Sequence, residues 1–390
     1  MDKKIFVVLG TRPEAIKLAP LVIELRKKPN LKADILVFRQ HGKVTDEILK
    51  VFGLEPTYKV GLMFGDRSIG RGVNIFLRIF NLIRTAFGLV KLLWLLTTKR
   101  PDLVIVQGDT STGLLAAMIA FHLKISVAHV EAGLRTHDKY HPFPEEMNRQ
   151  IICRLTDFHF APTTAAKENL TREGVPADKI WLTGNTAIDA LLFILKKQSN
   201  KEESERMKDL LKNEYGVLVD EKKIVIVTAH RRENFGKGLV GIFGAVKELA
   251  EKNPNIQFVV PVHTNPNVQK QAKDILESTK NITLTTPISY EPFIYLLSNS
   301  YLILSDSGGI QEEVSVLGKP ILVMREKTER AEGVSAGNAK LIGASKEAIL
   351  EAASELINDK NIYESMARKH SEFGDGTSCS QIAQVLSDEL

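Results

Sequence analysis

The sequence predicts an α/β protein with two doubly wound parallel sheets, and three observations support this. Short β-branched and aromatic runs alternate with helical patterns, the alternation occurs twice, and the runs are apolar throughout. Continuous apolar runs are typical of strands that helices cover on both faces. Strand–helix alternation implies parallel sheets with right-handed crossovers. We therefore expect two Rossmann-like domains that face each other across a cleft.

The expected strands fall into two groups. The first half carries them at residues 4–10, 33–38, 102–108, 126–131, 157–162 and 179–184. The second half carries them at residues 223–230, 256–263, 281–285, 301–306 and 320–324. The halves meet at residues 186–222, where an apolar segment runs into a charge-dense helical pattern. A chain of 390 residues is long enough for two domains. We expect domains at residues 1–185 and 186–372.

Composition and charge exclude several classes of protein. With 44% hydrophobic and 25% charged residues, the chain has globular composition. Its net charge of +5 resides in a basic stretch at residues 67–100, so no nucleic-acid partner is expected. Cys153 and Cys379 form no CxxC pair, so neither a disulfide framework nor a thiolate zinc site is indicated. The first residues lack a signal-peptide pattern, and we expect a cytoplasmic protein.

Polar clusters lie directly after several expected strands, where open α/β sheets bind ligands. Ser307-Gly308-Gly309 separates a strand from a helix, so bare backbone N–H groups and the helix dipole can form an anion cradle. Glu312 and Glu313 follow within the next turn, where a carboxylate can accept from two ribose hydroxyls. The alternative is an ordinary serine N-cap with acids in the first turn.

The turn Gly10-Thr11-Arg12-Pro13 repeats this theme in the first half. Pro13 suits the first position of a helix, Arg12 can fork onto a diphosphate, and Lys17 lies one turn further on. The alternative is two exposed cations on a surface helix. No Walker A sequence occurs, and the G-x-G-x-x-G at residues 236–241 begins several residues after its strand. Neither ATP-driven nor nicotinamide chemistry is therefore indicated.

Three carboxylates of the first half are acid–base candidates. Asp109 and Glu131 follow two strands, and Glu145 opens a helix. Carboxylates that converge on one site can divide into base, acid and charge stabiliser as their environments separate their pKa values. The alternatives are a turn residue for Asp109 and a first-turn acid paired with Arg149 for Glu145. A non-functional explanation is weakest for Glu131, because a carboxylate at the end of an apolar strand is energetically unfavourable unless it has a function.

Two histidines of the second half, His230 and His263, each end a strand. A protonated histidine beside a leaving diphosphate is plausible chemistry, and a strand-end histidine satisfied by the backbone is the alternative. His137 and His141 lie in a loop without a third ligand at a known spacing, so we expect no metal.

Together these motifs resemble the non-hydrolysing UDP-N-acetylglucosamine 2-epimerases, in order and over nearly the whole chain. The resemblance implies a fold of the GT-B type, in which the C-terminal helix at about residues 376–390 packs back onto the first domain. It also implies reversible conversion of UDP-GlcNAc to UDP-ManNAc for surface polysaccharides. The matching segments are 10–21, 107–112, 129–136, 142–149, 183–191, 228–234, 261–268, 305–313, 318–330 and 373–382.

The resemblance also assigns roles to individual residues. It places catalytic carboxylates at Asp109, Glu131 and Glu145, with Arg149 and His263 near the sugar. We group His230 with the catalytic residues because it would stand beside the leaving diphosphate. The diphosphate and uridine contacts fall on Arg12, Lys17, His230, Phe293, Ser307, Gly308, Gly309, Glu313 and Arg330.

The expected reaction explains why these parts are needed. The C2 proton of the sugar is not α to a carbonyl, so simple deprotonation is very difficult. Elimination of UDP across C1–C2 gives a glycal, and re-addition with the proton on the opposite face completes the inversion. This route needs firm diphosphate binding, carboxylates that move a proton, and a closing cleft. It needs no cofactor.

Some positions depart from the family pattern. The family's effector site uses a QHR-type segment, and this chain has Gln40-His41-Gly42-Lys43 with Arg67 downstream. Gln40, Lys43 and Arg67 therefore form only a possible effector site. Ala331 replaces a usual proline. The alternatives are a hydrolysing epimerase, an epimerase of a modified UDP-amino sugar, a glycosyltransferase, and an inactive UDP-sugar sensor. Retention of the three carboxylates argues against the sensor.

Residues 73–96 show the pattern of an amphipathic helix with a wide apolar face. Its arginine and lysine residues argue against a transmembrane span. We expect this helix to pack on the sheet and to form a subunit interface, which predicts a homodimer through the first domain. A basic helix lying on a membrane surface is the alternative.

Overall fold

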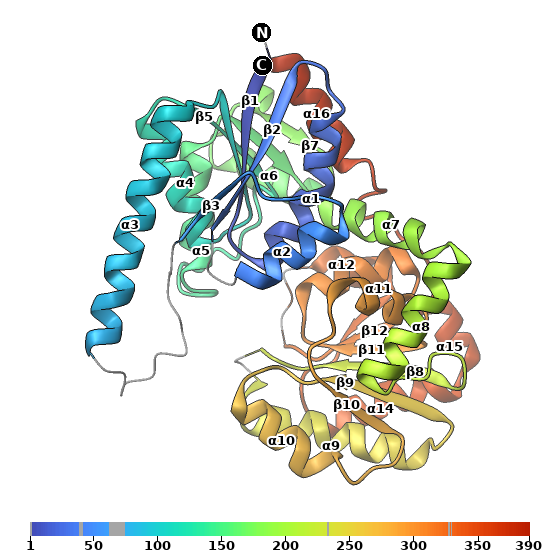
Figure 1. The fold of residues 1–390 in the computed structure, drawn as a ribbon. Coiled ribbons are helices and arrows are strands. Elements are labelled where there is room, and N and C mark those ends of the chain that lie inside the picture. The colour runs from blue at the N-terminus through green and yellow to red at the C-terminus, as the bar shows by residue number, and fades with distance from the viewer. Residues whose placement is uncertain (1, 39–41, 62–74, 232–233, 327, 329) are drawn as a thin grey trace. The chain divides into compact units, whose positions relative to one another are not determined.

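The chain forms two compact units. The computed structural model describes residues 2–38, 42–61, 75–231, 234–326, 328 and 330–390. Unit 1 comprises Met1–Ala190 and Gly374–Leu390, and unit 2 comprises Leu191–Phe373 (Figure 1). The chain passes from unit 1 to unit 2 inside helix α7 (Thr186–Gln198), slightly beyond the position expected from the sequence.

Within the described part of unit 1, seven parallel strands form one sheet in the order β3-β2-β1-β4-β5-β6-β7. The strands are β1 (Lys3–Leu9), β2 (Leu31–Phe38), β3 (Tyr58–Val60), β4 (Leu103–Gln107), β5 (Ser126–Val130), β6 (Phe158–Ala161) and β7 (Ile180–Leu182). The helices are α1 (Arg12–Arg26), α2 (Gly42–Val51), α3 (Ile75–Lys99), α4 (Ser111–His122), α5 (Glu145–Leu155), α6 (Thr164–Arg172), the 3₁₀ turn Ala177–Lys179 and α16 (Ser378–Glu389).

The sheet of unit 2 has six parallel strands among the described residues, in the order β10-β9-β8-β11-β12-β13. The strands are β8 (Lys223–Thr228), β9 (Ile256–Pro261), β10 (Ile282–Thr285), β11 (Leu302–Ser305), β12 (Ile321–Val323) and β13 (Ala339–Leu341). The helices are α8 (Lys201–Tyr215), α9 (Lys237–Lys252), α10 (Pro266–Leu276), α11 (Tyr290–Ser298), α12 (Gly308–Leu317), α13 (Ala331–Ala336), α14 (Lys346–Asn358) and α15 (Lys360–Met366).

Both sheets have the same doubly wound order. In each, the first strand lies in the middle, the next two strands are added on one side, and the chain then crosses to the other side. The direction of winding reverses between β1 and β4 in unit 1 and between β8 and β11 in unit 2. Ligands of such sheets bind beyond the carboxyl ends of the strands at this switch point. The expected α/β class with two Rossmann-like units is confirmed.

Two short strands were not expected from the sequence. All of the expected strands form, with ends that differ by a few residues. The unexpected strands, β3 and β13, have three residues each and lie at sheet edges. Such short edge strands carry little apolar periodicity, and their pairing depends on the neighbouring strand.

Apolar side chains on both faces of the central strands explain why the sheets are covered on both sides. In β1, Phe6 and Val8 join a cluster with α3 and α4, while Ile5 and Val7, which point to the other face, are also fully buried. In unit 2 the core joins β8, β9 and β11 to α9, α10 and α14. Burial on both faces fixes the register and therefore the positions of the strand ends.

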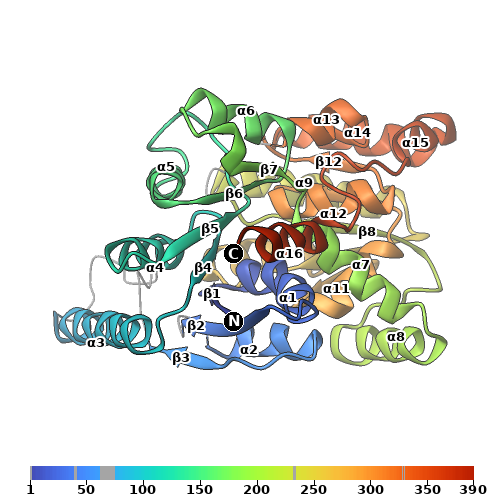
Figure 2. The ribbon, with the colours of Figure 1, turned by 90° about the horizontal axis from the view of Figure 1, so that it is seen from above.

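The C-terminal helix α16 belongs to unit 1, where it lies beside α1 (Figures 1 and 2). Two contacts join it to the segment after α1. Lys28 Nζ donates to Gln384 at 2.5 Å, and Asn30 Nδ2 donates to the carbonyl of Ser387 at 2.9 Å. At its other end, the carboxylate of Asp189 in α7 accepts from the backbone N–H of Cys379 at 2.8 Å. Helix α16 is therefore fixed at both ends to unit 1.

Helix α3 lies at the outer edge of unit 1, beside α4 (Figures 1 and 2). Leu92, Leu95 and Leu96 are buried in the core. Among the side chains of α3 that are described, from residue 87 on, Phe87, Val90, Leu93 and Trp94 are exposed and form a further apolar surface.

No helix among the described residues is long and apolar enough to cross a membrane.

Candidate active site

The switch point of unit 1 brings together the turns that follow β1 and β4. A Cβ atom on Gly10 would lie 2.7 Å from Oγ1 of Thr112 on α4, so only glycine permits this approach. Helix α1 begins with Pro13 in its first turn, after Thr11 at the N-cap. The two turns are therefore packed directly against each other.

Glu14 links these two turns through its buried carboxylate. Oε2 accepts from the backbone N–H groups of Gly10 at 2.9 Å and Thr11 at 2.6 Å. Oε1 accepts from the hydroxyl of Thr110 at 2.7 Å. Burial raises the pKa of Glu14, and these hydrogen bonds oppose the shift. Glu14 therefore joins the turn after β1 to the turn after β4 by hydrogen bonds.

Glu131 stands directly after β5 with a strained backbone. Its φ of 65° is in the left-handed region, which is costly for a residue with a side chain. Lys17 Nζ donates to Oε1 at 2.7 Å, and the Gln107 side-chain amide donates to Oε2. Glu131 is 9% exposed. Strain that the surroundings hold in place is common at functional positions.

Asp109 faces Arg149 of α5. Arg149 Nη2 and Nε lie 2.6 and 2.9 Å from Asp109 Oδ2, and Arg149 Nη1 also reaches Glu146 at 3.2 Å. Burial raises the pKa of Asp109, Arg149 opposes this shift, and the charges of Glu131 and Glu145 add to it. Glu131 and Glu145 therefore both lie within electrostatic reach of Asp109.

This arrangement is suited to proton transfer. Coupled carboxylates in one site cannot all ionise with equal ease, so one can hold a proton while another accepts one. Lys17 and Arg149 compensate part of the negative charge.

The switch point of unit 2 is organised by Asp306, which follows β11 and is fully buried. Its carboxylate accepts from the backbone N–H groups of His230 and Arg231, both at 2.9 Å, and from Asn234 Nδ2 at 3.1 Å. Asp306 therefore fixes the turn after β8 from the neighbouring strand, 76 residues later in the sequence.

His230 lies between this carboxylate and His263. Its Nδ1 is 3.3 Å from Asp306 Oδ1, and its ring stacks on that of His263 with centroids 5.8 Å apart. Burial lowers the pKa of His230, Asp306 opposes the shift, and Arg231 and His263 add to it. His263 Nδ1 accepts from the backbone N–H of Asn265 at 3.1 Å, which leaves Nε2 as the donor in the neutral ring.

The residues of the expected anion cradle lie at the start of α12. Ser307 is the N-cap, and Gly308 and Gly309 open the helix. Arg330 crosses this turn: a Cβ on Gly308 would lie 3.4 Å from its guanidinium carbon, and its Nε and Nη2 bind Glu312 Oε1 at 2.9 and 2.8 Å. A guanidinium beside bare helical N–H groups provides the positive environment that a phosphate requires.

The structure thus brings the predicted residues into two groups, one in each unit. Asp109, Glu131, Glu145, Arg149 and Lys17 gather in unit 1, and Lys17 contacts Glu131, although the sequence associated it with a diphosphate.

In unit 2, His230 joins His263, and Arg330 joins the cradle. The other predicted residues are placed as follows: Arg12 is half-buried at the start of α1, Phe293 is half-buried in α11, and Glu313 is half-buried in α12. The roles of all these residues remain predictions.

The possible effector residues lie outside the described part of the structure. Gln40 and Arg67 are not described, and the same holds for the side chain of Lys43.

The sequence did not assign a role to several residues that organise these groups. They share one feature, since each is an acid or amide at a strand end or in the first turns of a helix. They are Glu14, Gln107, Glu146 and Asp306. Their positions were visible in the sequence, but their partners come from other elements.

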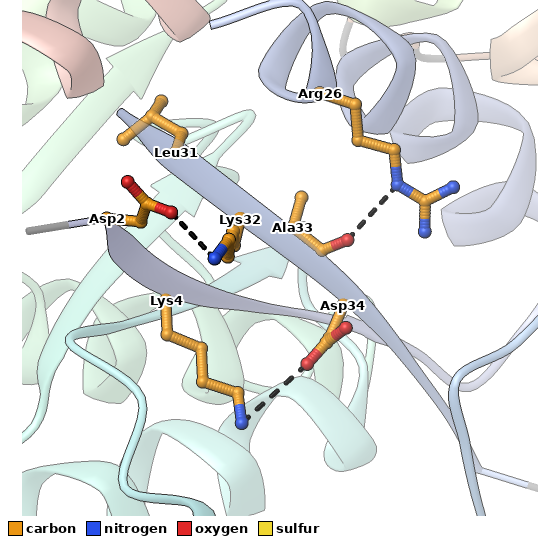
Figure 3. Close-up of a pocket in the computed structure, with 7 residues that line it drawn as sticks. All are labelled: Asp2, Lys4, Arg26, Leu31, Lys32, Ala33 and Asp34. Atoms are coloured by element: carbon orange, nitrogen blue, oxygen red, sulfur yellow. Dashed lines mark hydrogen bonds and ion pairs between the residues drawn. The ribbon is translucent and has the colours of Figure 1, made fainter. Parts of the chain in front are cut away.

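A surface depression of about 650 Å³ lies elsewhere, at the amino ends of β1 and β2 (Figure 3). Its charged side chains pair with each other, as in Lys32 with Asp2 at 2.6 Å and Lys4 with Asp34 at 3.8 Å. It lies at the opposite end of the strands from Thr11 and Asp109, and we do not assign a function to it.

Within the described ranges, no group of three or more histidine, cysteine, aspartate or glutamate residues could hold a metal ion.

Two Rossmann-like units of identical strand order, with clustered polar residues at their switch points, define a protein of the GT-B type. The family model described as UDP-N-acetylglucosamine 2-epimerase matches residues 23–387. The UDP-N-acetylglucosamine 2-epimerase of Campylobacter jejuni is 46% identical over 388 residues, which cover 99% of this chain and 98% of that protein. The chain belongs to the UDP-N-acetylglucosamine 2-epimerase family.

Solved structures agree with this assignment. The UDP-GlcNAc 2-epimerase of Neisseria meningitidis, bound to UDP-GlcNAc, has a TM-score of 0.88 and 40% identity, and the match covers 99% of this chain and 100% of that one. The Methanocaldococcus jannaschii enzyme, in complex with UDP-GlcNAc and UDP, has a TM-score of 0.80 and 33% identity, with 99% of each chain covered.

Proposed function

We propose that this protein interconverts UDP-GlcNAc and UDP-ManNAc by inverting C2 of the sugar. The observation that carries the proposal is the group of carboxylates Asp109, Glu131 and Glu145, with Glu131 buried and held at both oxygens. A protein that only senses a UDP-sugar has no need for this group, because a buried charge such as that of Glu131 is costly to maintain. Full-length similarity to enzymes of this name supports the same conclusion.

The proposed chemistry is elimination followed by re-addition. A carboxylate of unit 1 takes the C2 proton, the electrons of the C–H bond form the C1–C2 double bond, and the C1–O bond breaks to release UDP. The intermediate is a 2-acetamidoglycal. UDP then adds back to C1 while a second carboxyl group delivers a proton to the opposite face of C2. Each proton removed is replaced, so the reaction needs no net acid, base or oxidant.

Unit 2 would hold the nucleotide. The N–H groups at the start of α12 and the Arg330 guanidinium suit the diphosphate, while His230 would stabilise the charge that develops as UDP leaves. The buried Asp306 holds the backbone of His230 in place. Glu313 and Phe293 would contact the ribose and the base.

The decisive experiment follows the reaction by NMR in D₂O. Starting from UDP-GlcNAc, the expected result is a mixture with UDP-ManNAc in which C2 carries deuterium. Release of free ManNAc would instead indicate a hydrolysing enzyme, and no conversion would contradict the proposed function. Epimerisation with full retention of the original C2 hydrogen would contradict elimination with solvent exchange.

We further propose that the protein acts as a homodimer through α3 and α4. Phe87, Val90 and Trp94 of α3 are 73, 64 and 56% exposed, and Phe121 of α4 is 54% exposed. So many exposed large side chains on adjacent helices indicate a protein interface, and a second copy is the occupant we propose. Light scattering at micromolar concentration should give the mass of a dimer, and Trp94→Glu should shift it towards the monomer. A monomeric wild type would contradict the proposal.

The cytoplasm is the proposed location of this reaction. Cys153 and Cys379 are both free and buried, which is compatible with a reducing compartment.

A further inference from the structure

The carboxylate of Glu131 is fixed by side chains from two other elements. Lys17 reaches Oε1 from α1 at 2.7 Å, and Gln107 reaches Oε2 from the end of β4. Because these donors hold different oxygens, the plane of the carboxylate cannot rotate freely.

Gln107 is itself fixed by the turn that follows it. The N–H of Gly108 donates to the carbonyl of Val130 at 3.0 Å, and His129 Nε2 donates to the carbonyl of Gly108 at 2.7 Å. Burial lowers the pKa of His129 to about 3, so the ring is neutral and its single N–H serves this bond. Gln107 is 4% exposed. The buried side chain of Gln107 therefore contacts Glu131 from a turn whose backbone is held by hydrogen bonds.

Gly108 lies next to this contact. Its φ is 66°, and a Cβ at this position would lie 3.5 Å from Glu131 Oε2. The turn thus brings the backbone close to the same oxygen that Gln107 binds.

A neutral donor suits the second oxygen of a base. Cations on both oxygens would stabilise the ionised carboxylate strongly and would reduce its tendency to take a proton. An amide orients the oxygen at a smaller loss of basicity, because its hydrogen bond carries no formal charge.

We propose that Gln107 is a positioning residue for the C2 epimerisation, and that it acts by holding Oε2 of Glu131 in the orientation that proton transfer requires. This inference rests on the proposed function. It predicts a defect in turnover and not in substrate binding, because Gln107 acts through Glu131.

The test compares Gln107→Met with a matched control. Methionine has nearly the same length but lacks the amide, so kcat should fall about 10²-fold while KM stays close to the wild-type value. The control is Gln257→Met in β9 of unit 2, where the glutamine is also buried and donates to Thr283 at 2.9 Å. It should lower the Tm without lowering kcat.

A double-mutant cycle separates positioning from general damage to the fold. Once Glu131→Gln has removed the carboxylate, adding Gln107→Met should cause little further loss of kcat. Gln107→Asn keeps an amide but retracts it by one methylene, so it should show the same defect and serves if the methionine variant does not fold.

The outcomes distinguish this inference from the proposed function. A wild type that does not epimerise UDP-GlcNAc overturns the proposed function, and this inference with it. If the wild type is active but folded Gln107→Met or Gln107→Asn has the same kcat as the control Gln257→Met, the positioning role of Gln107 is overturned. The proposed function then still stands. Independent losses in the double-mutant cycle overturn it as well.

Discussion

The two units share one strand order, but their switch points carry opposite chemistry. In unit 1 the strand ends hold carboxylates, several of which face cations, as in Glu131 with Lys17 and Asp109 with Arg149. In unit 2 one buried carboxylate, Asp306, receives backbone and side-chain N–H groups, and histidines, glycines and the Arg330–Glu312 pair lie near the other strand ends. The same fold therefore places carboxylates at the switch point of one unit and mainly N–H donors at that of the other.

This difference shows that the fold provides the location and the strand-end residues provide the chemistry. A group that moves protons needs carboxylates with altered affinity for a proton, and burial, with the charges of Glu131 and Glu145 adding to it, raises the pKa of Asp109. A group that binds an anion needs donors that stay fixed, which the hydrogen bonds of Asp306 achieve. Substitutions in unit 1 should therefore impair turnover, and those in unit 2 should impair binding or local folding.

The largest expected effect is that of Glu131→Gln. This substitution keeps the shape and an amide but removes the ability to take a proton, so kcat should fall by ~10²–10⁴-fold. Binding of UDP-GlcNAc, measured by calorimetry, should be largely retained. A loss of less than about tenfold would be too small for a proton-transfer role.

Asp306→Ala should have the next largest effect, on stability. It leaves the N–H groups of His230 and Arg231 and the Asn234 amide without their acceptor, at ~1–3 kcal/mol for each one that stays buried. Urea unfolding should show that the free energy of unfolding falls by an amount on the order of 3 kcal/mol. Asp306→Asn keeps one acceptor oxygen and should lose less, and equal losses would contradict this account.

Ser307→Ala should weaken UDP binding by roughly 1–2 kcal/mol through one lost hydrogen bond. The Ser307 hydroxyl makes no capping bond to α12 among the described residues, so stability should change little. The control is Ser345→Ala, because Ser345 caps α14 by accepting from the N–H of Ala348 at 3.3 Å. Ser345→Ala should be less stable than the wild type but should bind UDP with the same affinity. If Ser307→Ala instead lost stability and kept its UDP affinity, the role of the cradle would be contradicted.

The smallest effect is expected from Asp109→Asn, which should raise the free energy of unfolding, whereas Asp306→Ala should lower it. Because burial raises the pKa of Asp109, the folded chain holds this proton more tightly than the unfolded chain does. Stability due to this group is therefore present in acid and is lost as pH rises through the raised pKa. At neutral pH the asparagine variant should be up to about 1 kcal/mol more stable, although less active.

This advantage should disappear below about pH 4, where the carboxyl is protonated in both states. Thermal unfolding at several pH values measures it. A variant that is less stable than the wild type at neutral pH would show that the Arg149 pair outweighs the cost of burial.

Several features could be predicted from the sequence for local reasons. Runs that are mostly apolar, such as residues 102–108 and 223–230, identify buried strands, because burial on both faces favours apolar residues at successive positions. Pro13, Gly308 and Gly309 indicate helix starts through their own backbone preferences. The edge strands β3 and β13 could not be predicted in this way, since three residues carry no periodicity and their pairing depends on β2 and β12.

The sequence by itself determined that the alternation of strands and helices occurs twice. It also determined that Asp109, Glu131 and His230 lie at the ends of strands. The family resemblance also rests on sequence alone. Only the tertiary structure decided the partner of each group. Lys17 reaches Glu131 across 114 residues, and Asp306 reaches the turn after β8 across 76. The physical reason is that strand order makes β1, β4 and β5 consecutive neighbours, and likewise β8 and β11. The partners of a buried charge follow from this order and not from distance along the chain.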